Sequence, residues 1–238
     1  FISAGSAHAK PDQHSHLTDI RTRRAMSLTQ YINSGVRRVP AWPLYILGAA
    51  YMLWEFWQGL NGLGPYGVEP INVLEREYGE IALILLIAGL AVTPLRIWAG
   101  INLIKFRRAI GLLAFFYILA HFIVFAVLDV QTLGRVVTEV IKRPYVTVGF
   151  LGFLSLIPLA VTSNNWSIRR MGPLRWRRLH KLAYPAAIMG ALHYIWLVKG
   201  WPLEPFLYMG AVIALLVLRL NWTKIRDVLV PGRWQAGR

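Results

Sequence analysis

Long runs of apolar residues, separated by short charged stretches, dominate the pattern along the chain. A helix that crosses the hydrocarbon core of a bilayer needs about 20 residues. The runs are continuously apolar rather than alternating, which favours helices over a barrel. The pattern therefore predicts an all-α, polytopic membrane protein with a six-helix transmembrane bundle. The predicted spans are Pro43–Gly59, Ile81–Trp98, Ala109–Leu128, Val146–Val161, Leu182–Val198 and Phe206–Leu218.

The composition supports this class and removes several kinds of site. Of the 238 residues, 56% are hydrophobic and only 16% are charged, whereas roughly 25% are charged in an average soluble domain. The chain has no cysteine, which excludes disulfide scaffolds, iron–sulfur clusters and thiolate zinc sites. Polar chemistry in the bundle must therefore come from His, Arg, Glu, Tyr or Asn side chains.

The distribution of Lys and Arg predicts the orientation. With the N-terminus inside, 21 of the 26 basic residues fall on one side of the membrane, so the positive-inside rule places both termini in the cytoplasm. The net charge of +15 lies in short juxtamembrane segments where anionic lipid is a sufficient partner, and nucleic-acid binding is not expected. The expected parts are a polar cytoplasmic leader, disordered in part, over residues 1–40, a six-span domain over 41–222 and a basic cytoplasmic tail over 223–238.

Two histidines within predicted spans are candidates for a cofactor site, because ionisable groups are costly inside a bilayer. The third and fifth spans run in the same direction. His121 lies about 12 Å before Asp129, and His193 lies about 10 Å before Gly200, at 1.5 Å per residue. Both imidazoles thus fall at one depth near the outer face. Facing imidazoles at one level suit six-coordinate haem iron, whereas zinc would need a third ligand.

A third histidine lies closer to the cytoplasmic side. His180 precedes His193 by an axial offset of about 20 Å, so one interpretation is a second, inner haem held by His180. The other is an ordinary juxtamembrane histidine. Arg107 occupies the corresponding depth on the third span and shares a helical face with His121, whereas Arg108 does not. Arg107 is open to three roles: axial ligand, partner of a haem propionate or positive-inside charge. The last two suit the chemistry of arginine better.

Taken together, these stretches resemble the ferric-reductase-like transmembrane family, and within it the haem-binding subunits of periplasmic methionine sulfoxide reductase systems. The resemblance covers roughly residues 40–225. It rests on Thr93–Leu95, Arg107–Arg108 with Gly111–Leu112, Leu119–His121, Lys142–Gly149, Leu159–Ser163, Trp176, Leu179–His180, Tyr184 and His193–Trp196.

The resemblance implies a cofactor set and partners. Proteins of this kind carry b-type haem, one or two, and FMN is also attributed to them. They pass electrons from the quinone pool or a cytosolic flavin reductase to a periplasmic molybdopterin enzyme that reduces methionine sulfoxide, and they lie in the bacterial inner membrane. The family's functional histidines fall on His121, His180 and His193. The broader pattern has two histidines on each of two helices, and this chain departs from it at Arg107 and Arg108.

The expected function is therefore a transmembrane electron conduit that makes no bond to sulfoxide itself. The basic segment Arg169–Lys181 suits the phosphate of a flavin and suits lipid headgroups equally well. Two alternatives remain open from the sequence. One is a ferric reductase of the same architecture, and the other is a proton or metal-ion transporter that uses buried histidines, although the inverted repeats typical of transporters are not seen.

Overall fold

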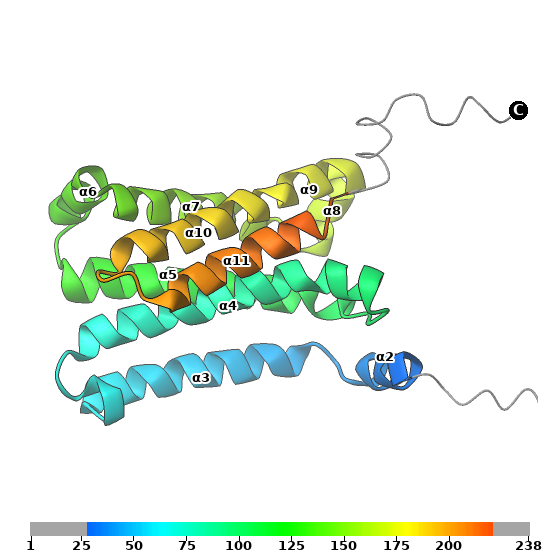
Figure 1. Ribbon diagram of the computed structural model, residues 1–238, viewed down its shortest axis with the longest axis horizontal. Coiled ribbons are helices and arrows are strands. Elements are labelled where there is room, and N and C mark those ends of the chain that lie inside the picture. The colour runs from blue at the N-terminus through cyan, green and yellow to red at the C-terminus, as the bar shows by residue number, and fades with distance from the viewer. Residues whose placement is uncertain (1–27, 221–238) are drawn as a thin grey trace, which may run out of the picture.

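Long helices that run roughly side by side form the body of the protein (Figure 1). The computed structural model describes residues 28–220, and the predicted basic tail lies outside them. Every regular element in the described part is helical. The long helices are α3 (Trp42–Asn61), α4 (Pro70–Trp98), α5 (Arg107–Ile123), α7 (Pro144–Val161), α10 (Ala183–Leu197) and α11 (Leu203–Val217).

Each of the predicted apolar segments falls on one of these long helices. Three stretches within residues 28–220 are long and apolar enough to cross a membrane, namely Pro70–Trp98, Ile104–Asp129 and Pro144–Val161, and Leu203–Val217 is a shorter apolar helix. The all-helical class of a multi-pass membrane protein is confirmed. The number of spans and the side on which the termini lie stay predictions.

Short helices cover the two ends of the bundle. Helices α2 (Leu28–Arg38), α8 (Asn165–Met171) and α9 (Pro173–Leu179) lie at one end, and α6 (Leu133–Lys142) lies at the other (Figure 1). Each of the first three carries two arginines in its last turn. The arginine-rich segments thus gather at one end of the bundle, as the predicted orientation requires.

Local sequence signals explain several helix boundaries. Pro70 and Pro144 stand in the first turns of α4 and α7, where a missing backbone N–H costs nothing. Gly62 closes α3 in a left-handed conformation, with φ of 60°, which glycine adopts without steric cost. The Asn164 side chain caps α8 by accepting a hydrogen bond from the backbone N–H of Ser167 at 2.7 Å.

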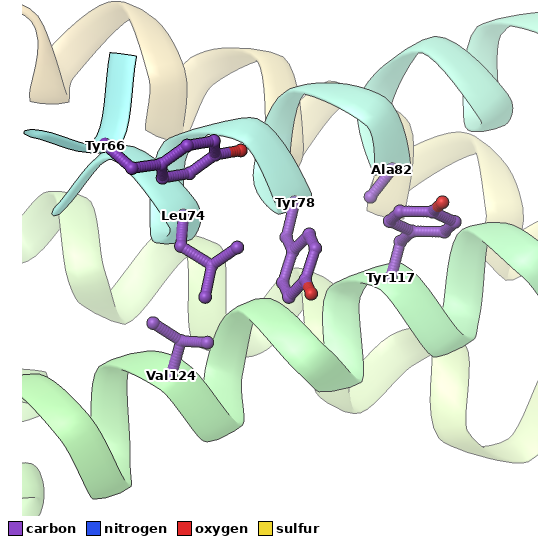
Figure 2. Packing of buried hydrophobic residues seen from close by; sticks show 6 residues of the cluster. All are labelled: Tyr66, Leu74, Tyr78, Ala82, Tyr117 and Val124. Atoms are coloured by element: carbon purple, nitrogen blue, oxygen red, sulfur yellow. The ribbon is translucent and has the colours of Figure 1, made fainter. Parts of the chain in front are cut away.

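Helix α4 is central to the packing, because it contributes to all three buried clusters. One cluster joins it to α3 and α5, the second to α10 and α11, and the third to α5, α7 and α10. Figure 2 shows the first cluster, whose members are Tyr66, Leu74, Tyr78, Ala82, Tyr117 and Val124. The helix therefore presents buried side chains on several faces, and its neighbours assemble around it.

Tyrosine hydroxyls fasten α3 to this core. The Tyr78 hydroxyl donates to the carbonyl of Met52 at 2.7 Å, and the Tyr117 hydroxyl donates to the carbonyl of Gly48 at 2.8 Å. The two phenol rings meet edge to face, with centroids 5.8 Å apart. Since a buried hydroxyl needs a partner, these bonds fix which turns of α3 face α4 and α5.

A π-helical segment, η3 (Val124–Asp129), continues α5 directly after the turn that carries His121. The N–H of Val124 reaches the carbonyls of both Ala120 and His121. Such π segments are rare and often accompany functional sites. The change of helical pitch lies between His121 and the loop that leads to α6.

Candidate functional site

A cavity of about 310 Å³ lies between α4, α5, α7 and α10. This volume falls at the lower end of the range for small-molecule and cofactor sites, about 300–1,000 Å³. His121 and His193 both line the cavity, from α5 and α10. The two histidines that the sequence places at one depth are therefore brought together at one chamber inside the bundle.

The imidazole rings of His121 and His193 have centroids 6.3 Å apart and planes inclined at 78°. Two imidazole nitrogens that share one metal ion each lie about 2 Å from it, and the half-widths of the rings add about 2 Å more, which gives roughly 6 Å between ring centres. The observed separation agrees with a single metal ion between the two rings.

Backbone hydrogen bonds fix the tautomer of both rings. Nδ1 of His121 lies 2.8 Å from the carbonyl oxygen of Glu75 on α4, and Nδ1 of His193 lies 2.7 Å from that of Tyr145 on α7. A carbonyl only accepts, so Nδ1 must carry the proton in each ring. Nε2 then holds the lone pair on both histidines. This is the arrangement found in metal-binding histidines, whose other nitrogen donates to a carbonyl or carboxylate.

Phenylalanine side chains form one wall of the cavity. Phe122 and Phe153 stack at 5.1 Å between centroids with planes only 22° apart, and Phe122 also meets Phe150 at 5.6 Å. Phe125 lines the cavity as well. This wall is apolar, and its flat aromatic surfaces suit a planar macrocycle better than a hydrated ion.

The cavity also has polar lining residues, namely Asn72, Glu75, Arg76, Glu80, Asp129 and Arg143. Arg143 pairs with Glu139 at 2.5 Å and donates to the Tyr145 hydroxyl at 2.9 Å. An apolar wall and charged side chains thus meet in one chamber, as an amphipathic ligand with acidic substituents would require.

A multi-ligand metal site finds no support in the described part of the chain. Within residues 28–220, no three side chains of the His, Cys, Asp or Glu type converge as ligands for a metal ion. Two histidines alone cannot complete the tetrahedral shell of zinc. A macrocycle that supplies four equatorial nitrogens leaves two axial positions, which agrees with the donor set at the cavity.

His180 lies apart from this chamber and is not among the residues that line it. Its ring stacks on Trp176 with centroids 3.8 Å apart, and its Nδ1 donates to the Trp176 carbonyl at 3.1 Å. Nε2 lies 3.4 Å from the Ser163 hydroxyl. The residue belongs to a short 3-10 turn, η4 (His180–Leu182), before α10.

Burial lowers the pKa of His180, and the nearby positive charge of Arg107 lowers it further, against the opposing effect of the hydrogen bond to Trp176. The neutral imidazole, which is the form that binds metals, is therefore favoured. Arg107 itself begins α5 and is exposed. Arg108 donates to the Asn165 side chain at 2.8 Å, which ties the start of α5 to α8 and gives Arg108 a structural partner.

Sequence reasoning missed the glycines and carbonyls that hold the two rings. A Cβ atom on Gly79 would lie 3.1 Å from Nδ1 of His121, and one on Gly149 would lie 2.8 Å from Nδ1 of His193. The sequence does not show what a glycine in an apolar helix packs against. Every residue has a backbone carbonyl, so the sequence does not show which carbonyl accepts a hydrogen bond either. The phenylalanines at i and i+3 in Phe122–Phe125 and Phe150–Phe153 were a readable signal for a shared face.

Comparisons with known proteins find a transmembrane family and curated relatives to which this chain is similar. The family described as "Ferric reductase like transmembrane component" matches residues 78–191. The chain is 46% identical over 180 residues to a protein of Brucella anthropi named "Protein-methionine-sulfoxide reductase heme-binding subunit MsrQ", a match that covers 75% of this chain and 80% of that protein. Proteins of the same name from Brucella ovis and Brucella canis are 45% identical over the same shares. No solved structure matches the chain.

Proposed function

Because the chain belongs to the MsrQ family of ferric-reductase-like transmembrane proteins, we propose that it is a haem-binding electron-transfer subunit of a methionine sulfoxide reductase system. It carries electrons across the membrane to a periplasmic reductase and does not touch the sulfoxide itself. The observation that carries the proposal is the pair of imidazoles 6.3 Å apart, each with its Nε2 lone pair left free by a backbone hydrogen bond.

The residues around the cavity fit a b-type haem. His121 and His193 would hold the haem iron, and the phenylalanine wall would pack against its apolar ring system. Arg76 and Arg143 are the cationic side chains among the polar lining residues, and they would meet the carboxylates of the haem through charge-assisted hydrogen bonds. When bound, such a haem supplies a one-electron carrier.

The protein orients the ligands and controls the surroundings. The carbonyls of Glu75 and Tyr145 hold each imidazole in one tautomer and one plane, which raises its basicity as a ligand. The apolar wall keeps water away from the site, and low polarity together with ligand identity sets a haem potential. Electron transfer needs no movement of these groups, so a rigid bundle is suited to the task.

The partners follow from the family. The relatives' name identifies a methionine sulfoxide reductase, and we propose that the acceptor is the periplasmic molybdopterin enzyme, MsrP. The donor would be the quinone pool or a cytosolic flavin reductase, and reductant would enter at the arginine-rich end formed by α2, α8 and α9. Placement in the bacterial inner membrane and a site for FMN near Arg169–Lys181 stay predictions from the resemblance.

The absorption spectrum of the purified protein tests the proposal directly. We expect a reduced-minus-oxidised difference of the b type and at least one haem per chain by pyridine haemochrome assay. Reduction by a quinol should be followed by reoxidation when the molybdopterin partner and oxidised substrate are added. A colourless preparation would contradict the proposal. Rapid reduction of free ferric chelates, without a response to the partner, would favour the ferric reductase alternative.

His180→Ala separates the two possible haem counts. We propose that His180 holds a second, inner haem, since its Nδ1 donates to the Trp176 carbonyl and leaves the lone pair on Nε2. The variant should lose about half of the haem per chain and keep the low-spin spectrum of the outer haem. Unchanged haem content in His180→Ala would show that the chain carries one haem only. The matched control is Trp176→Phe, which keeps an aromatic ring beside His180.

A further inference from the structure

We propose that Gly79 and Gly149 are positioning residues for the two axial imidazoles. Each glycine leaves its helix surface open where an imidazole crosses it, so that the ring can bond a carbonyl of that helix. The inference rests on the proposed haem site and adds two residues that act through the ligands rather than on the haem.

Both imidazole rings lie very close to the backbone of the helix that they cross. A Cβ on Gly149 would lie 2.8 Å from Nδ1 and 2.9 Å from Cγ of His193. A Cβ on Gly79 would lie 3.1 Å from Nδ1 and 3.3 Å from Cε1 of His121. Carbon and nitrogen atoms that are not bonded pack at about 3.5–4.0 Å. Any side chain at these positions would push the imidazole away.

Each glycine stands one helical turn after the residue whose carbonyl accepts the hydrogen bond from the imidazole. Glu75 precedes Gly79 by four residues, and Tyr145 precedes Gly149 by four. A side chain at position i of a helix lies beside the carbonyl of residue i−4, which is why Ser and Thr can bond back to it. Ser155 on α7 does so with the carbonyl of Leu151 at 2.8 Å. A glycine at i therefore uncovers the second lone pair of that carbonyl for a donor from another helix.

The same combination, a glycine four residues after a carbonyl that bonds a histidine ring, occurs twice, on different helices. The α4–α5 pair presents Gly79 and the Glu75 carbonyl to His121, and the α7–α10 pair presents Gly149 and the Tyr145 carbonyl to His193. Close contacts also occur at Gly48, where a Cβ would lie 2.5 Å from Leu113, and at Gly152, where one would lie 3.4 Å from Met189, but among the described glycines only Gly79 and Gly149 face an imidazole. A Cβ on Gly89 would have its nearest neighbour at 3.7 Å, and no described atom lies within 4 Å of one on Gly111.

Alanine at either glycine should displace the ring and lengthen its Nδ1–H bond to the carbonyl. The effect should be graded, because the clash at Gly149 is the tighter of the two. Loss of such an outer hydrogen bond lowers metal affinity by about 10-fold to 100-fold. A displaced imidazole also weakens the axial bond, which converts low-spin six-coordinate iron towards a high-spin five-coordinate state.

The experiment compares Gly149→Ala and Gly79→Ala with the wild type as full-length protein purified in detergent. Haem per chain, the dissociation of haem to an acceptor protein, and the low-spin fraction per bound haem are measured. We expect at least a tenfold faster loss of haem or a predominantly high-spin spectrum for Gly149→Ala, and a smaller change of the same kind for Gly79→Ala. The control variants Gly89→Ala and Gly111→Ala should match the wild type.

Because the spectra are normalised to bound haem, poor folding does not imitate the expected result. Unchanged low-spin spectra and unchanged haem dissociation in both glycine variants would overturn the inference, even if their yield falls. Equal losses in the control variants would also overturn it, since helix packing alone would then explain the effect. A wild-type protein without haem would instead contradict the proposed function.

Discussion

Replacing His193 by alanine is expected to abolish the low-spin signal of the outer haem, and His121→Ala should do the same. Each variant removes one of the two imidazoles whose ring centroids lie 6.3 Å apart at the cavity, and the backbone carbonyls of Glu75 and Tyr145 cannot replace an imidazole nitrogen as a ligand. We expect haem content to fall at least tenfold, by the magnitude seen when metal sites lose supporting groups, with any residual haem high-spin.

A chemical rescue distinguishes loss of the ligand from loss of the fold. His193→Gly leaves a space the size of the imidazole, and free imidazole added to this variant should restore a low-spin spectrum. The wild type provides the control, because its position is already filled. Full low-spin haem in both alanine variants without added imidazole would show that the axial ligands lie elsewhere.

Tyr66→Phe is expected to give the largest loss of stability among conservative substitutions in α3, η1 (Gly64–Gly67) and their neighbours. Tyr66 is 1% exposed, and its hydroxyl donates to the carboxyl group of Glu55, which is 6% exposed. A buried polar group that loses its partner costs about 1–3 kcal/mol. The midpoint of thermal unfolding, measured in detergent, should therefore fall by several degrees.

The double variant gives this prediction its control. When both partners are replaced, as in Glu55→Leu with Tyr66→Phe, neither of these two buried positions keeps an unpaired polar group, and most of the lost stability should return. Only the hydroxyl of the exposed Tyr51, which also bonds Glu55, loses a partner. Tyr45→Phe on the same helix removes a hydroxyl that lies away from Glu55 and should leave the midpoint unchanged. Additive losses in the double variant would show that the bond contributes nothing.

The positions of the long helices were predictable because the bilayer imposes a length on apolar runs. The start of α4 was not predictable in this way. The predicted apolar span begins at Ile81, whereas the helix begins at Pro70. Glu75, Arg76, Glu77 and Glu80 interrupt the apolar run without interrupting the backbone hydrogen bonds. Hydropathy indicates which side chains favour contact with lipid, whereas a helix continues for as long as its backbone N–H and C=O groups are hydrogen-bonded.

The sequence did not predict which helices pack against each other. Helix α7 packs chiefly on α10, and α11 packs on α4 and α10. Every face of these helices is apolar, so the periodicity that orients a helix in a soluble protein is weak here. Short helices such as α6 carried a signal at Leu133, Val136, Val137, Val140 and Ile141, where apolar residues recur at helical spacing.

The candidate site was half predictable. Depth along two parallel spans brought His121 and His193 to one level, and the structure places their rings at one cavity. The same reasoning set His180 at the inner end, and the structure keeps it away from that cavity. The depth of the two histidines along their spans could not reveal the glycines. Which residues of two helices touch depends on how each helix is rotated about its own axis, and one histidine on each helix does not determine that rotation.

The division of the site between two helix pairs constrains the order of biogenesis. Synthesis proceeds from the N-terminus, so α4 and α5 enter the membrane together with His121 while α10 is still unmade. A nascent chain at that stage contains only one of the two imidazoles and only the α4 and α5 side of the cavity. In the proposed site the second imidazole is present only after α10 has been made, so we expect stable haem binding to follow the insertion of α7 and α10.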